Sequence, residues 1–141
     1  MQVQPYLFFD GRCEEAVAFY RQALGAQVVM LMHYSDAPAA GAGCPGGTPA
    51  ADKVMHACLQ IGQSQVMASD GYAAGHPEFK GVSLSIAADD DAQARRFFDA
   101  LADGGQVQQP LEPSFFASSF GMVADRFGVS WMVVAGAQGP G

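Results

Sequence analysis

Short apolar segments alternate with amphipathic stretches along this chain of 141 residues. The first segment, Val3 to Phe9, is apolar and aromatic, which predicts a strand. The next, Glu14 to Leu24, carries its apolar residues at helical spacing and is followed by Gly25, so it predicts a helix that ends there. Three further strands are predicted at 27–34, 53–61 and 65–69, the last two as a hairpin.

The same order of segments returns after a polar connector at 70–80. Gly81 to Ala87 alternates like a strand, and Ala92 to Asp103 has apolar residues on one helical face. That face carries Ala94, Phe97, Phe98 and Leu101. The pattern then predicts strands at 106–109, 120–125 and 129–135, with a loop at 110–118.

The two halves match each other in order and in spacing. Phe97-Phe98 follow Phe19-Tyr20 by about 78 residues, and each pair is followed by a glycine, a glutamine and a valine at similar distances. Two amphipathic helices that end in glycine also look alike by chance, but here the flanking strands agree as well. The repeat predicts two strand–helix–strand–strand–strand modules, at about 3–70 and 81–135. They form one domain at 1–135, followed by a disordered tail at 136–141.

The amino-acid composition indicates which binding partners and which cellular location to expect. Acidic residues outnumber basic ones by 14 to 7, giving a net charge of −7 that repels phosphate backbones, so we expect no nucleic-acid partner. The three cysteines include no CxxC pair, which favours a reducing, cytoplasmic location over a disulfide framework. Neither a signal peptide nor a membrane-spanning segment is predicted, because no long apolar run is present.

Several motifs together resemble a known family. They are PYLFF at Pro5, MHACLQIG at Met55, MASD at Met67 and VADRFGVSW ending at Trp131. This set resembles the PhnB-like branch of the glyoxalase/bleomycin-resistance/dioxygenase (vicinal oxygen chelate) superfamily, often labelled 3-demethylubiquinone-9 3-methyltransferase-like. The resemblance covers nearly the whole chain. It implies an α+β fold of two βαβββ modules with curved mixed sheets, and a homodimer.

The methyltransferase label implies S-adenosylmethionine, which the sequence does not favour. The turn after the first strand, starting at Asp10, has no GxG element of the kind that cradles a nucleotide-like cofactor. The resemblance also implies metal-ligand positions, which fall on Pro5, Met67, Gly81 or Val82, and Met132. None of these residues is a His or a carboxylate, so we expect neither a metal nor another cofactor.

Polar candidates for chemistry are few. His33 and His56 lie on neighbouring predicted strands and Asp70 lies at a strand end, so each is a candidate base, hydrogen-bond donor or ligand of a non-standard metal site. The alternative for each His is a bond to a backbone carbonyl or a place in an interface. His76 is expected at the surface.

Residues expected to bind a small molecule are apolar or aromatic, with one hydroxyl. Met and aromatic surfaces suit planar or irregular apolar ligands, although the same residues could instead form the core. Phe115 and Phe116 lie in a predicted loop, where they could cap a ligand or anchor a dimer. The full set is Tyr6, Phe8, Met67, Ser69, Phe115, Phe116 and Trp131.

Three functions remain open at this point. The first is a metal-independent small-molecule-binding protein, and the second is an enzyme that uses His33, His56 or Asp70. The third is an inactive structural dimer whose sheets are filled by their own side chains. The sequence names no ligand and does not distinguish modules that pair within one chain from modules swapped between two.

Overall fold

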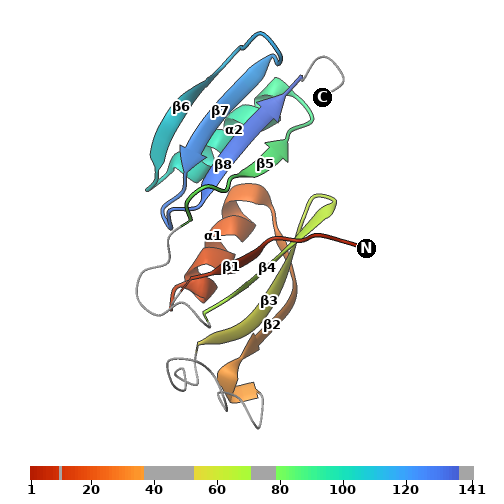
Figure 1. Ribbon diagram of the computed structural model, residues 1–141, viewed down its shortest axis with the longest axis vertical. Helices are drawn as coiled ribbons and strands as arrows, with labels where there is room; N and C mark the ends of the chain where they lie inside the picture. Colours follow the sequence, from red (N-terminus) through yellow and green to blue (C-terminus); the bar gives the residue numbers. More distant parts are fainter. Residues whose placement is uncertain (10, 37–52, 71–78, 137–141) are drawn as a thin grey trace. The chain divides into compact units, whose positions relative to one another are not determined.

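The computed structural model describes residues 1–9, 11–36, 53–70 and 79–136 (Figure 1). The chain divides into two compact units, which we call unit 1 (Met1–Pro77) and unit 2 (Glu78–Gly141). Most of the predicted loop at 35–51, most of the connector at 70–80 and nearly all of the tail fall outside the described residues. So do Asp10, Cys44 and His76.

Unit 1 folds as one helix against a four-stranded mixed sheet (Figure 1). Its strand order is β1-β4-β3-β2, in which β1 pairs parallel with β4 and the other pairs are antiparallel. Its elements are β1 (Tyr6–Phe8), α1 (Cys13–Leu24), β2 (Gln27–His33), the 3₁₀ turn η1 (Tyr34–Asp36), β3 (Val54–Ile61) and β4 (Ser64–Ser69).

Unit 2 repeats this topology, with strand order β5-β8-β7-β6 and the parallel pair again formed by its first and last strands. Its elements are β5 (Leu84–Ala87), α2 (Asp91–Ala102), β6 (Gln106–Glu112), β7 (Ser119–Ala124) and β8 (Ser130–Ala135). The expected α+β fold of two βαβββ modules is therefore confirmed. Among the described residues, no helix is long and apolar enough to cross a membrane.

Three strand boundaries were wrong: β1 begins at Tyr6 rather than Val3, β5 begins at Leu84 rather than Gly81, and the third is the end of β6. The sequence predicts that the strand at 106–109 ends before Pro110, but β6 continues to Glu112. Proline lacks a backbone N–H and is therefore tolerated only at a sheet edge or a bulge. Both conditions hold, because β6 is the edge strand and its register with β7 shifts between Gln109 and Glu112.

Alternation of side chains, interrupted by bulges in the edge strands, divides each sheet into a buried face and an open one. In unit 1, Leu7 and Phe9 point toward α1, where the Phe9 ring lies 6.4 Å from that of Tyr20. The buried face continues through Ala57, Leu59, Val66 and Ala68. Fully burying one such side chain stabilises the fold by about 1.5–3 kcal/mol, so this face fixes the register of the strands and determines which residues face away.

In unit 2 the face toward α2 is identified by a close approach. A Cβ added to Gly121 would meet Cε2 of Phe98 at 2.6 Å, so position 121 faces the helix. Val133, the strand partner of Gly121, and Val123, two residues along β7, lie on the same face and are buried. Glycine at 121 therefore allows the helix and sheet to pack closely.

Candidate functional site

The face of the unit 1 sheet that points away from α1 gathers most of the predicted site residues. Register places Tyr6 beside Met67, Met67 beside Cys58, and Cys58 beside Met30, so these four form one row across all four strands. A second row lies two residues along. We call this surface the open face of unit 1, and its members are Tyr6, Phe8, Met30, Met32, His56, Cys58, Met67 and Ser69.

A tyrosine–histidine pair is the polar feature of this face. The Tyr6 hydroxyl lies 3.0 Å from Nδ1 of His56, and their rings are 5.6 Å apart. The Phe8 ring stacks against Tyr6 at 4.9 Å in a tilted arrangement. The pair therefore presents a hydrogen-bonding centre beside an aromatic surface, and both rings remain partly accessible.

An amide row borders the open face at one end. The Gln4 side-chain amide donates to Oε1 of Gln65 at 3.3 Å, and Gln65 donates in turn to Oε1 of Gln60 at 3.2 Å. Amides both donate and accept hydrogen bonds, so this edge of the face is polar without carrying charge.

Ser69 belongs to the same face by register but is 2% exposed, so its neighbours cover it. Asp70, which follows it, is also buried and is bound by backbone amides. Oδ1 accepts from the N–H groups of Gly11 (2.7 Å) and Cys13 (2.9 Å), and Oδ2 accepts from Val54 N–H (2.9 Å). These contacts give Asp70 a structural task at the start of α1, whose own N-cap residue makes no side-chain cap.

His33 lies away from the open face, at the end of β2. Its Nε2 is 2.8 Å from Oε1 of Glu14 on α1, and Asp36 accepts from its backbone N–H at 2.8 Å. The hydrogen bond to Glu14 is the main cause that raises the pKa of His33 above 6.5. This exposed ion pair does not join the Tyr6–His56 pair.

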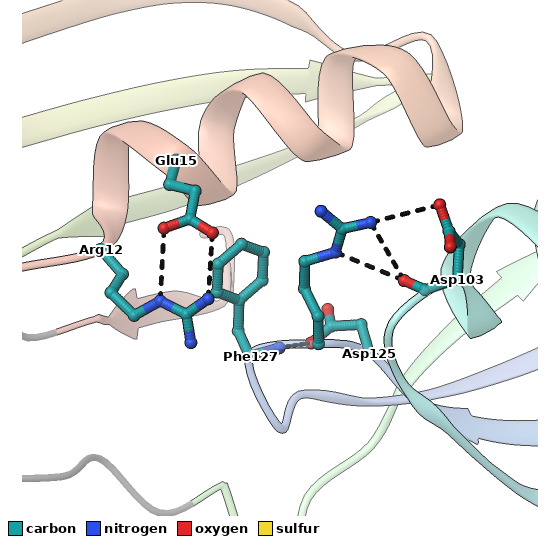
Figure 2. Close-up of polar contacts among 6 residues, drawn as sticks. Arg12, Glu15, Asp103, Asp125 and Phe127 are labelled. Carbon is teal, nitrogen blue, oxygen red and sulfur yellow. Dashed lines mark hydrogen bonds and ion pairs between the residues drawn. The ribbon is translucent and has the colours of Figure 1, made fainter.

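Trp131 does not contribute to an open face. It pairs with Val123, lies on the helix side of unit 2 and is 3% exposed. Its indole N–H donates to Oδ2 of Asp125 at 2.9 Å, and Oδ1 of Asp125 accepts from Val129 N–H. Oδ1 also accepts from the backbone N–H of Phe127 (Figure 2). The distinctive DRFGVSW turn is therefore organised around a buried carboxylate.

The open face of unit 2 is apolar. Its central residues are Phe120, Met122, Met132 and Val134. Phe116 packs edge-on to Phe120 with ring centroids 5.1 Å apart, and Phe115 packs on Phe116 while remaining 97% exposed. The two loop aromatics are thus linked to this face, with the outer ring in solvent.

The residues at the implied metal positions do not fit a divalent ion. Register places Tyr6 rather than Pro5 beside Met67, and Ser85 rather than Gly81 or Val82 beside Met132. A phenol, a hydroxyl and two thioethers are poor ligands for the metals that His and carboxylates bind. Among the described residues, no three His, Cys, Asp or Glu side chains converge as such a site requires.

The strand-to-helix turns also do not fit a cofactor such as S-adenosylmethionine. Backbone amides at a helix N-terminus are the groups that bind a cofactor's anionic part. In unit 1 Asp70 already occupies those of Gly11 and Cys13, and in unit 2 the Asp90 side chain accepts from Gln93 N–H. At both turns an Asp side chain already accepts from the backbone N–H groups that a cofactor's carboxylate would need.

Comparison with known proteins agrees with this architecture. Residues 1–134 match the family described as 3-demethylubiquinone-9 3-methyltransferase. The chain is 32% identical to protein YjdN of Escherichia coli (strain K12), over 99% of each chain.

Several solved structures are similar to this chain in sequence or in fold. Protein PA1353 from Pseudomonas aeruginosa is 45% identical with a TM-score of 0.82, covering 96% of this chain and 97% of that one. A putative 3-demethylubiquinone-9 3-methyltransferase, PhnB protein, from Bacillus cereus is 25% identical with a TM-score of 0.79, covering 96% and 99%. A glyoxylase/bleomycin resistance protein/dioxygenase domain from Frankia sp. EAN1pec shares the fold at 11% identity and a TM-score of 0.68, covering 96% and 97%. The chain therefore belongs to the 3-demethylubiquinone-9 3-methyltransferase family, in its PhnB-like, glyoxalase-like branch.

Proposed function

We propose that this glyoxalase-like protein binds a planar aromatic small molecule on the open face of unit 1, without a metal. The observation that carries the proposal is the 3.0 Å contact between Tyr6 and His56 on a face otherwise made largely of aromatic and thioether groups. A ring that packs on Phe8 and Tyr6 could bring a hydroxyl or carbonyl to this pair, since ligand sites combine apolar walls with a few polar groups.

The test uses the reduced head group of ubiquinone, which is the hydroquinone form of the quinone class that the family description names. Binding is measured by calorimetry and by the rise in melting temperature of the full chain, because a ligand that binds only the folded state stabilises it. We expect Tyr6→Phe to remove one hydrogen bond worth about 1 kcal/mol, which weakens binding about fivefold.

A matched control comes from the repeat. Phe120 on β7 of unit 2 is the equivalent of His56 on β3 of unit 1. Each residue lies on the strand that pairs with the edge strand of its sheet. Phe120→Ala should leave affinity unchanged, whereas His56→Ala should weaken it. Equal losses in both variants, or no loss in either, would contradict binding on the unit 1 face.

The enzyme alternative is favoured by the same pair. A phenol hydrogen-bonded to an imidazole can pass a proton, so Tyr6 and His56 could act as an acid/base couple on a bound ligand. Turnover of the hydroquinone that is lost in both Tyr6→Phe and His56→Ala, with binding retained, would establish this function. If turnover were lost only in His33→Ala, the catalytic residues would instead be His33 and Glu14, which form the ion pair at the end of β2.

We further propose that the chain forms a homodimer. The Phe115 ring is 97% exposed although it packs on Phe116, and exposed aromatics of this kind are typical of contact surfaces. Light scattering of the native chain should give twice the monomer mass, and Phe115→Ser should shift it toward the monomer. A monomer at every concentration would contradict both the proposal and the structural-dimer alternative.

A further inference from the structure

Three sulfur-containing side chains lie side by side on the open face of unit 1. Cys58 on β3 has Met67 of β4 as its partner on one side and Met30 of β2 on the other. Directly paired residues of antiparallel strands point to the same face, with Cβ atoms about 4.5–5.5 Å apart. A thiol therefore lies between two flexible thioethers, and Cys58 makes no disulfide.

A β-bulge brings the third sulfur into this row. Register shifts between Val28, which pairs with Leu59, and Met30, which pairs with Cys58. Val29 is the additional residue, so Met30 rather than Val29 stands opposite the cysteine. Bulges re-aim side chains and are common beside functional sites. Met30 is 41% exposed, which leaves the row accessible from solvent.

A nitrogen ligand lies next to the sulfurs. His56 is two residues from Cys58 on β3 and is the partner of Met32 on β2, so it shares the open face. The Tyr6 hydroxyl lies 3.0 Å from Nδ1 of His56. Nε2 of His56 has no hydrogen-bond partner among the residues that the structure describes. Metal-binding histidines characteristically have one ring nitrogen fixed in this way by a second residue while the other binds the ion.

We propose that Cys58, Met30 and Met67, with Nε2 of His56, form a binding site for a soft monovalent cation, Cu⁺ or its analogue Ag⁺. Thiolate and thioether ligands select Cu⁺ over the harder metals that carboxylates bind. The described residues of the open face include no Asp or Glu, so the preference for a soft ion is not offset by hard oxygen ligands. This site requires no organic ligand and does not depend on the function proposed above.

Binding has a defined proton balance. Cys58 enters as a thiol and coordinates as a thiolate, so one proton leaves the site for each ion bound. His56 coordinates as the neutral ring, with Nδ1–H donating to the Tyr6 hydroxyl oxygen. No change in oxidation state takes place.

Unit 2 provides an internal control for this site. The equivalent row there is Ser85–Met132–Met122–Gln109, which keeps two thioethers but has neither the thiol nor a neighbouring histidine. Double replacement of Met122 and Met132 by Leu therefore removes as many thioethers as replacement of Met30 and Met67. Only the replacement of Met30 and Met67 should weaken binding of the ion.

The experiment titrates Ag⁺ into the full chain by calorimetry in thiol-free buffer, in a Cys44→Ser background that removes the thiol outside the described residues. We expect one ion per chain, with one proton released. Cys58→Ser should abolish this binding. Tyr6→Phe, which frees the ring of His56, should weaken it about tenfold, as loss of a ligand's supporting partner typically does.

Met30→Leu/Met67→Leu should weaken Ag⁺ binding by at least as much as Tyr6→Phe, and Met122→Leu/Met132→Leu should leave it unchanged. Circular dichroism of each variant confirms that the fold is retained. Binding that needs Cys58 but is indifferent to Met30 and Met67 would show a simple thiol adduct and overturn the proposal. So would the absence of stoichiometric binding, or equal losses in the two methionine double variants.

Discussion

Replacing Asp70 by Ala tests whether this carboxylate holds the first strands and the helix of unit 1 together. The change leaves three backbone N–H groups without an acceptor: those of Gly11, Cys13 and Val54. At about 1.5 kcal/mol for each hydrogen bond to a charged group, the three bonds together contribute about 4.5 kcal/mol. Gly11 is half-buried and water can replace its partner, so we expect a loss of about 3–4 kcal/mol in the free energy of unfolding.

The assay is urea denaturation of the full chain followed by circular dichroism, with stability compared through the transition midpoint. Asp90→Ala is the matched control, because Asp90 caps α2 through one exposed bond to Gln93 N–H. Loss of such a cap costs about 1 kcal/mol. If Asp70→Ala destabilised the chain no more than Asp90→Ala, the structural role of Asp70 would be refuted and its candidacy as a catalytic residue would gain weight.

Other contacts described above predict the outcome of three further experiments. Glu14→Gln should lower the pKa of His33, measured by NMR titration; the stabilisation from this pair is complete below pH 6.5 and is lost as pH rises through the raised pKa. The Cys13 thiol, whose pKa burial raises to about 12, should resist a thiol reagent at neutral pH until the chain unfolds. Gly121→Ala places a methyl against Phe98 and should cost about 1–3 kcal/mol in urea denaturation.

Each of these has a result that would count against it. An unchanged His33 titration in Glu14→Gln would show that Glu14 is not the main cause of the raised pKa. Rapid labelling of Cys13 in the native chain would show that unit 1 opens readily around the start of α1. A Gly121→Ala variant as stable as the native chain would mean that α2 can move away from its sheet without cost.

Local patterns predicted the elements of this fold well, for physical reasons. Helical spacing located both helices to within one residue at each end, since Gly25 and the residues around Asp103 stop them. The hairpin of β3 and β4 followed from two apolar runs around Gly62, which has φ of 58°. The repeat then determined the order of the elements in both units.

The roles of individual side chains were harder to predict because their partners are distant in sequence. Asp70 accepts from residues 57 and 59 positions away, and Tyr6 meets His56 across 50 positions. Alternation shows that Trp131 and Met132 face opposite sides, but only the tertiary structure shows that the tryptophan faces α2. The bulge at Val29 leaves no clear signature in an apolar run such as Gln27 to His33.

That bulge has a consequence for how this protein could diverge. Because Val29 is the additional residue, deleting it would leave Val28 opposite Leu59 and Met30 opposite Cys58, in a regular ladder. A deletion elsewhere in β2 would instead shift the pairing by one residue and exchange the two faces of the strand. Relatives that lack one residue at this bulge should therefore keep the same side chains on the open face, whereas relatives that lack a residue farther along β2 should not.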